Sequence, residues 1–335
     1  MKKIILLIVV CLMAIVTTTQ AASEYTGKVF LQHNGTITQT FNGDEISNAI
    51  AAAEEGDTIF LSKGLFKSGF TINKSISLIG SGAEAGQNSQ KSTYLEWSGT
   101  SPYIQADDNK TLSSVTIEGV FSGLGFGVYG NIENVTFKKC YFPNSLDISS
   151  TTKSAIIDRC LLSSIYFDGN IEDLTAKNCK INSVSGSGGQ SISACKLINC
   201  NIYQVNSSTK ALFVNCIINQ VGNGTSNYLG TNAMLVNTLY HKLNGYDPME
   251  QTSQQDCWST TETLIDNNNS SLDCSLTAEQ LKASGYLGVD DTVVGVEGGV
   301  NPYSLTIHAP SINSKSANID LTNKKVTINV NVTAN

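Results

Sequence analysis

Apolar residues recur along the chain with a period of about twenty residues between positions 115 and 240. Cysteines mark the period. Apolar side chains stand five and three residues before each of them and two residues after. A fixed period with apolar residues at the same offsets indicates stacked structural units that share one core. The cysteines are Cys140, Cys160, Cys179, Cys200 and Cys216, and Val120 and Thr238 occupy the same slot in an earlier and a later copy.

The offsets within one copy predict three short strands separated by bends. In a straight strand, the two apolar side chains before the cysteine would point to one face, whereas the cysteine and the apolar side chain after it would point to the other. A single straight strand cannot bury both sets, so a bend must directly precede the cysteine. Asparagine, which tolerates the left-handed backbone of a sharp bend, stands there in four copies. The residues at the bend are Asn178, Asn199, Asn215 and Asn237, with Lys139 and Arg159 in two further copies.

A closed coil of about twenty residues with three strands is typical of a right-handed parallel β-helix, an all-β solenoid with three sheets. The leucine-rich repeat has a similar period, but it requires leucine at fixed offsets and a helical segment in each repeat. Here the slots hold Cys, Ile, Val, Phe and Ala, and no helical period intervenes. We therefore predict the β-helix over residues 23–285.

The two ends of the stack are expected to carry caps, because an open solenoid exposes its core. Residues 44–55 have helical composition with an Asp start, and they predict an N-terminal capping helix. In residues 286–335, Val326, Ile328, Val330 and Val332 alternate with polar residues. We predict that this strand pairs with residues 316–321 as a hairpin and that the segment closes the other end.

Residues 1–22 have the pattern of a signal peptide. Lys2 and Lys3 precede an apolar run over residues 4–16, and Ala21 and Ala22 follow as small residues. Thirteen apolar residues are too few to span a bilayer, and no other run is long enough. We expect an exported protein without a membrane span, located in the periplasm, on the cell surface or outside the cell.

The stretch over residues 44–82 resembles the entry segment of pectate-lyase-like β-helix proteins. That resemblance rests on a helix, a Gly-Asp-Thr strand and an apolar strand that ends in Gly, within "AIAAAEEGDTIFLSKGLFKSGFTINKSISLIGSG". The tail is similar to that of uncharacterised secreted β-helix proteins from Bacteroidetes, through Gly298, Gly299, Pro302, Tyr303 and Pro310. The resemblance implies the fold. It does not choose among lyases, hydrolases and non-catalytic members of the superfamily.

The formal net charge of −7 makes nucleic acid and anionic membranes poor partners. Abundant Asn, Ser and Thr suit a polysaccharide partner, and they equally suit the turns of any β-solenoid. We expect the cysteines of the repeat to form a buried row of free thiols. Cys257 and Cys274 fall outside the predicted repeat and are the candidates for a disulfide in an exported chain. No Cys/His spacing predicts a metal site, and no cofactor is expected.

Catalytic candidates are few. A lyase needs a base and a cation that neutralises the substrate carboxylate. Arg159, the single arginine, falls in the bend slot and is expected to be solvated. Asp147, Tyr166 and Asp168 are predicted on one outer face, with the carboxylates roughly 8 Å apart by strand spacings. That separation suits an inverting glycosidase. The third Asp and the Gly-His motif of the pectin-hydrolase relatives are missing, so solvated carboxylates are the favoured interpretation.

The same face continues with neutral polar residues beside Tyr166, namely Ser164, Gln204 and Gln220. Such a row can bind a glycan along the stack, although an ordinary hydrated face has the same composition. The favoured function is a secreted, non-catalytic β-helix that acts as a surface or glycan-contacting scaffold. The alternative is a divergent polysaccharide lyase or glycoside hydrolase.

Overall fold

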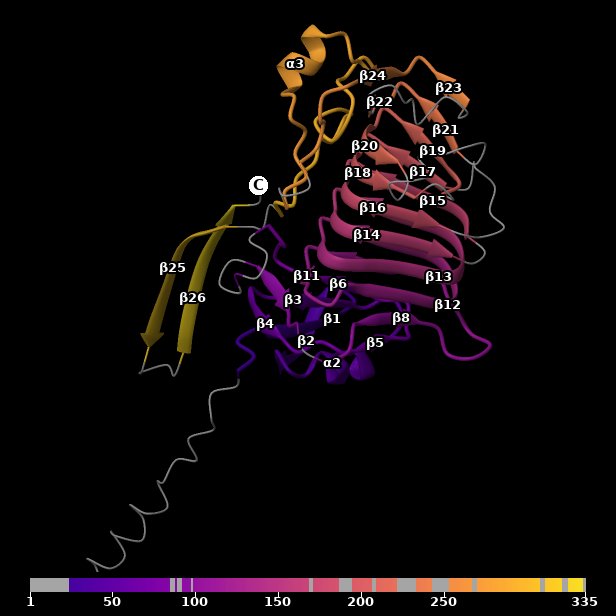
Figure 1. Ribbon diagram of the computed structural model, residues 1–335. Helices are drawn as coiled ribbons and strands as arrows, with labels where there is room; N and C mark the ends of the chain where they lie inside the picture. The colour runs from indigo at the N-terminus through magenta and orange to yellow at the C-terminus, as the bar shows by residue number, and fades with distance from the viewer. Residues whose placement is uncertain are drawn as a thin grey trace, which may run out of the picture.

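The computed structural model (Figure 1) describes residues 24–84, 88, 92–97, 99–168, 171–186, 195–206, 209–221, 233–242, 253–266, 270–307, 311–320 and 325–333. The predicted signal peptide lies outside these residues. The fold is a right-handed parallel β-helix of about eight turns, as the period predicts. Each turn contributes up to three strands, one to each of three sheets. We number the sheets in the order in which the chain passes through them within one coil.

The first sheet contains the strands that end at the bend before the cysteine slot. Its strands are β3 (Thr58–Leu61), β6 (Ser77–Ile79), β10 (Val115–Glu118), the ends of β12 (Phe126–Lys138) and β13 (Tyr141–Asp158), β15 (Ile171–Lys177), β17 (Cys195–Ile198), β19 (Ala211–Val214), β21 (Ala233–Val236) and β23 (Ser253–Gln255). The short strand β9 (Thr111–Leu112) pairs with the middle of β12.

The second sheet begins just after the cysteine slot. Its strands are β4 (Gly64–Phe66), β7 (Thr93–Leu95), β11 (Phe121–Ser122), the starts of β13, β14 (Leu161–Asp168), β16 (Lys180–Gly186), β18 (Asn201–Val205) and β20 (Ile217–Val221), then β22 (Leu239–His241) and β24 (Trp258–Thr260). The third sheet follows after another bend. It contains β5 (Thr71–Ile72), β8 (Tyr103–Gln105), the start of β12 and the later parts of β13, β14, β16, β18 and β20.

The five cysteines of the repeat form one buried row, as predicted. All five are fully buried and free, and Val120 and Thr238 continue the row with no exposure. Neighbouring coils are linked through the thiols, because the backbone N–H of Cys160 donates to Sγ of Cys179 at 3.4 Å. The Cys179 thiol in turn donates to the carbonyl oxygen of Lys177 at 3.2 Å. The row therefore contributes hydrogen bonds as well as small apolar volume to the core.

The bend residues have the left-handed backbone that the sequence pattern predicts. The four asparagines have φ between 45° and 55°, and Lys139 and Arg159 adopt 51° and 53°. Asp256 has φ 53° as well, and it directly precedes Cys257. The repeat thus extends one coil further than expected, and Cys257 occupies the cysteine slot of that coil.

This placement corrects the predicted disulfide. Cys257 packs against the main core, whereas Cys274 packs against a second apolar cluster outside the coils. Both thiols are free. Their separate environments explain why the two cysteines do not pair.

The N-terminal cap is confirmed with shorter bounds, as helix α2 (Ile46–Ala52). Its buried side chains Ile46, Ala49 and Ile50 close the first coil. Strand β1 (Lys28–His33) pairs antiparallel with β3 and with β2 (Thr36–Asn42). None of the described helices is long and apolar enough to cross a membrane.

The tail confirms one expectation and corrects another. Strands β25 (Ser311–Asp320) and β26 (Lys325–Thr333) form the predicted antiparallel hairpin, which is a sheet of its own. Residues 286–307, which we call the strap, begin against the side of the last described coil, where the rings of Tyr286 and Trp258 lie 5.6 Å apart, and do not continue across its end as expected (Figure 1). After helix α3 (Ala278–Ala283) they run back along the bends toward the first coils (Figure 1).

Hydrogen bonds to the bend residues establish this course. Asn237 donates to the carbonyl of Leu287 at 3.4 Å, and Asn178 donates to the carbonyl of Gly298 at 2.8 Å. Further along, Nζ of Lys139 donates to the carbonyl of Thr306 at 2.6 Å. The strap uses the bend residues because their polar side chains form a regular row on the outside of the coils.

Candidate functional site

The outer face of the third sheet carries the residues that the sequence suggested. Asp147 pairs with Gly127 on one side and with Tyr166 on the other. Tyr103 pairs with Gly127, one coil further toward the N-terminus. Because side chains in register on a parallel sheet stack about 4.8 Å apart, these residues form one continuous row. We call Tyr103, Tyr129, Asp147 and Tyr166 the tyrosine strip.

Two tyrosine rings of the strip lie over a glycine. The rings of Tyr103 and Tyr129 have their centroids 5.5 Å apart. A Cβ atom on Gly127 would lie 2.5 Å from the ring of Tyr129 and 2.6 Å from that of Tyr103. Any side chain at position 127 would therefore displace both rings, so the glycine is what allows the two rings, inclined at 54° to each other, to lie here.

Asp147 is held in place by two hydroxyl groups. Tyr129 donates to Oδ2 at 3.3 Å, and Ser149 donates to Oδ1 at 2.6 Å. Burial, followed by the negative charge of Asp147, raises the pKa of Tyr129, so its hydroxyl stays a donor at neutral pH. A carboxylate has about four acceptor sites, so roughly two remain for a ligand.

Asp168 lies on the same outer face as Asp147, as the sequence predicts. It pairs with Ser149 and is therefore diagonal to Asp147. The position of its side chain is not part of the described structure, so the separation of the two carboxylates stays a prediction. Among the paired positions of this face that the structure describes, no third carboxylate and no histidine accompany them. The arrangement offers one oriented carboxylate beside aromatic rings.

The neutral row is also confirmed in register. Ser164 pairs with Ser183, Ser183 with Gln204, and Gln204 with Gln220. This row lies on the same outer face as Tyr166, two positions earlier along each strand. Hydroxyl and amide groups thus continue from the tyrosine strip toward the later coils.

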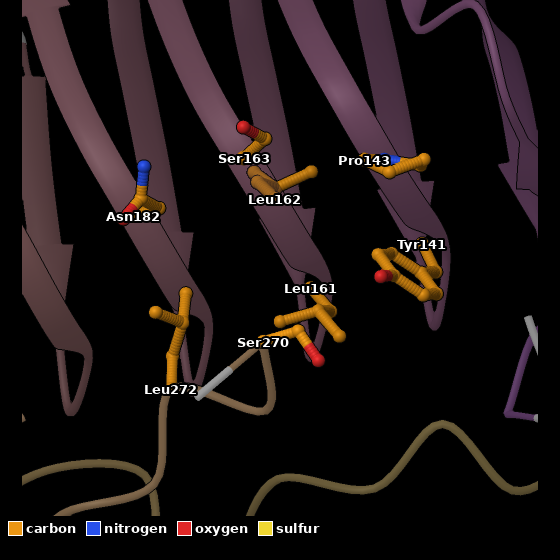
Figure 2. Close-up of a pocket in the computed structure, with 8 residues that line it drawn as sticks. All are labelled: Tyr141, Pro143, Leu161, Leu162, Ser163, Asn182, Ser270 and Leu272. Atoms are coloured by element: carbon orange, nitrogen blue, oxygen red, sulfur yellow. The ribbon is translucent and has the colours of Figure 1, made fainter. Parts of the chain in front are cut away.

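A separate hollow lies against the second sheet, and Figure 2 shows its lining. Tyr141, Pro143 and Leu161 form its floor, and residues 270 and 272 of the loop before α3 close one side. Ser163 and Asn182 are the polar groups at its edge, and the volume is about 250 Å³. The hollow is formed by residues of a different sheet from the one that carries the tyrosine strip.

The outer row of the second sheet is otherwise covered by the later part of the chain. Leu161, Ile217 and Leu239 follow the cysteine slot directly and pack against residues 264–265 and 272–305. Lys180, in the same row, is 7% exposed. It pairs with Asp273 and lies 4.5 Å from the ring centroid of Tyr303. Sequence reasoning missed this row because its residue types vary from coil to coil, although three large apolar residues at one outward offset were a usable signal.

The expectation for Arg159 is partly wrong. It stands at the bend, as predicted, but its side chain is 18% exposed rather than solvated, and it pairs with Asp158 at 2.7 Å. The buried cysteines offer no nucleophile, because burial raises the pKa of Cys160, Cys179 and Cys200 well above the ordinary value. Within the described residues, no group of three or more His, Cys, Asp or Glu side chains could hold a metal ion.

The fold and this face define a parallel β-helix with an aromatic and acidic outer strip. Comparisons with protein families, with curated proteins and with solved structures find no match to this chain. The function must therefore be argued from the strip itself.

Proposed function

We propose that this protein is an exported, non-catalytic β-helix that binds a glycan on the outer face of its third sheet. The observation that carries the proposal is the tyrosine strip, in which two rings, inclined at 54° to each other, lie over Gly127 beside an oriented carboxylate. Aromatic faces bind the apolar C–H faces of sugar rings, and neighbouring hydroxyl, amide and carboxylate groups bind the sugar hydroxyls. All three kinds of group stand on this face.

The direction of the bound glycan follows from the register. Equivalent side chains repeat along the stack at about 4.8 Å, which is close to the advance of one sugar in an extended glycan. A chain lying along the stack can therefore contact Tyr103, Tyr129, Asp147 and Tyr166, which belong to four consecutive coils, with successive sugars. The serine and glutamine row would continue the same contacts toward the later coils.

Export, and descent from the pectate-lyase-like superfamily, are parts of the same proposal. Residues 1–22 support export through their basic start, apolar run and small residues. The β-helix with its N-terminal helix supports the relationship to the superfamily. An exported solenoid with a polar, aromatic face is suited to contact polysaccharides outside the cytoplasm.

The proposal is tested with a panel of soluble polysaccharides in affinity electrophoresis. In Tyr129→Ala and Tyr166→Ala, we expect binding to weaken about fivefold each, since an aromatic contact contributes about 0.5–1.5 kcal/mol. Tyr94→Ala, a half-exposed tyrosine of the second sheet, is the matched control and should retain affinity. Unchanged binding in both strip variants, with the fold intact by circular dichroism, would refute this site.

The same samples distinguish the catalytic alternative. Wild-type protein is incubated with each polysaccharide, and new reducing ends and unsaturated ends are measured. We expect neither to form. Hydrolysis that falls by about 10²–10⁴ in Asp147→Asn would replace the binding function with a glycosidase, because that is the ordinary loss for a general acid or base.

A further inference from the structure

We infer that the tyrosine strip is selective for a glycan with positively charged amino sugars and that it rejects polyuronates. This inference rests on the proposed glycan-binding function and adds the chemical class of the ligand. It follows from the signs of the charges on the third sheet and from the hydrogen bonds that hold Asp147.

The paired positions of this outer face carry charge of one sign. From Thr71 in β5 to Gln220 in β20, the described outward rows contain Asp147 and Asp168 as their charged residues. Every other member of these rows is Tyr, Ser, Thr, Gln or Gly. A sugar carboxylate placed on these rows would meet carboxylates, and the paired positions that the structure describes hold no cation that could neutralise it.

The lysines nearest along the chain do not change this picture. Lys110, in the turn after β8, pairs with Asp107 at 2.9 Å. Lys153, later in β13, pairs with Glu133 at 2.5 Å. Each lysine therefore has its charge balanced locally by a carboxylate, and neither leaves net positive charge beside the strip.

The early end of the strip carries a further negative charge on Asp108, whereas Asp107 is paired with Lys110. A hollow of about 430 Å³ lies there, lined by Thr71, Asn73, Gln105, Asp107 and Asp108. Thr71 and Gln105 belong to the same outer rows as Tyr103 and Tyr129. A glycan that follows the rows would run from this acidic hollow over the tyrosine rings to Asp147.

Asp147 can accept hydrogen bonds from an ammonium group. Its two oxygens are already oriented by Tyr129 and Ser149, and about two acceptor sites remain. A protonated amine offers three donors, and the faces of Tyr103 and Tyr129 attract a cation in addition. Neutral sugars make only the stacking and hydroxyl contacts, while a carboxylate in the same place is repelled.

The test compares three oligosaccharides of equal length by titration calorimetry with the full chain. They are a glucosamine oligomer, its N-acetylated neutral form and a galacturonate oligomer. We expect the glucosamine oligomer to bind at least about fivefold more tightly than the neutral form, which corresponds to one partly shielded ion pair. We expect no binding of the galacturonate oligomer, and a preference for the cation that shrinks as salt is raised.

Two variants identify the carboxylate that causes the preference for the glucosamine oligomer. Asp147→Asn keeps the shape and should bring the glucosamine and N-acetylglucosamine affinities to within about twofold of each other. Asp173→Asn is the matched control, because Asp173 is an exposed carboxylate of the first sheet, paired with Lys196. It should leave the preference unchanged.

The possible outcomes distinguish a failure of the charge selectivity from a failure of the proposed glycan-binding function. The charge selectivity would be overturned if all three oligomers bound with equal affinity or if the galacturonate oligomer bound most tightly. The glycan site would still stand if Tyr129→Ala weakened that binding. A preference for the glucosamine oligomer that persists in Asp147→Asn would overturn the assigned residue. Absence of binding to all three oligomers, while the polysaccharide panel still binds and Tyr129→Ala weakens that binding, would overturn the ligand class alone. Absence of binding to the panel as well would overturn both proposals.

Discussion

At the scale of single residues, one slot in each coil dictates much of the structure. The cysteine slot is fully buried from Cys140 to Cys216, and Thr238 replaces the thiol with a hydroxyl that makes the same backbone contact. A small side chain with a weak donor fits here because the position is fully enclosed beside the bend and the carbonyl two residues earlier accepts its hydrogen bond. Larger residues at this position would overpack the core.

Thiol labelling of the native protein tests this row. The five buried cysteines should react slowly, because none of their side chains is exposed and the reagent cannot reach the sulfur atoms. Cys257, which is only half buried at the last described coil, should react faster. Reaction is followed with a chromogenic disulfide, and peptide mapping identifies the labelled sites. Rapid labelling of alternate members of the row would mean that the register is wrong.

At the scale of elements, the N-terminal cap depends on polar groups around a short helix. Helix α2 has seven residues and no side-chain cap at its N-terminus, so its own hydrogen bonds contribute little stability. Lys74, from the next coil, donates to the carbonyls of Ile50, Ala51 and Ala53 at 2.6–3.0 Å. The ammonium thus satisfies carbonyl groups that the end of the helix leaves open.

Lys74→Met should destabilise the protein by about 1.5–3 kcal/mol, the range for hydrogen bonds to a charged group. Methionine keeps the length of the side chain and removes the donors. The free energy of unfolding is measured by urea titration, with Lys67→Met, an exposed lysine, as control within about 0.5 kcal/mol. An equal loss in the two variants would contradict the capping role.

The turn between β1 and β2 is attached to the cap through a histidine. Nδ1 of His33 lies 2.7 Å from Oδ1 of Asp57, a carboxylate that is 5% exposed. The hydrogen bond and the charge of Asp57 raise the pKa of His33. Protonated His33 therefore stabilises the folded state. That contribution is complete below the unfolded pKa of about 6.5 and is lost as the pH rises through the raised pKa.

The predicted pH dependence is measured by urea unfolding of wild-type protein and His33→Gln between mildly acidic and mildly alkaline pH. Wild type should be more stable than the variant at acidic pH, and the difference should shrink as the pH rises. A difference that grows with pH would show that neutral His33 is the stabilising form.

At the scale of the whole molecule, the strap joins coils that are far apart in the sequence. It contacts bend residues from Asn237 back to Lys139, and it helps to cover the outer row of the second sheet. Gly299 is one point of close approach. Its φ is 78°, and a Cβ there would lie 2.3 Å from Nδ2 of Asn199.

Gly299→Ala should therefore destabilise the docked strap by about 1–3 kcal/mol through overpacking. Hydrogen exchange over residues 286–307 should become faster, while the inner strands keep their protection. Gly285→Ala is the control, since that glycine has a similar φ of 75° and nothing within 4 Å of the added Cβ. Equal effects of both changes would mean that backbone strain, and not contact with Asn199, causes the loss.

The tyrosine strip was only partly predictable. The register of Asp147, Tyr166 and Asp168 followed from pleat parity, because each strand repeats the one before it. The contribution of Tyr103 and Tyr129 did not follow, since it depends on both rings lying over Gly127. That contact involves coils before the cysteine period becomes regular, where sequence alone sets no register.

The sequence by itself determined the coil, its bends and its buried thiols. These features arise from contacts between neighbouring copies, and such contacts leave a periodic pattern that can be read directly. Only the tertiary structure decided that residues 264–266 and 270–305 pack on the outside of the second sheet and that Lys180 is largely buried. Those contacts join segments about a hundred residues apart that share no period. Their position depends on shape and hydrogen bonding across the finished solenoid, which no local pattern of apolar and polar residues encodes.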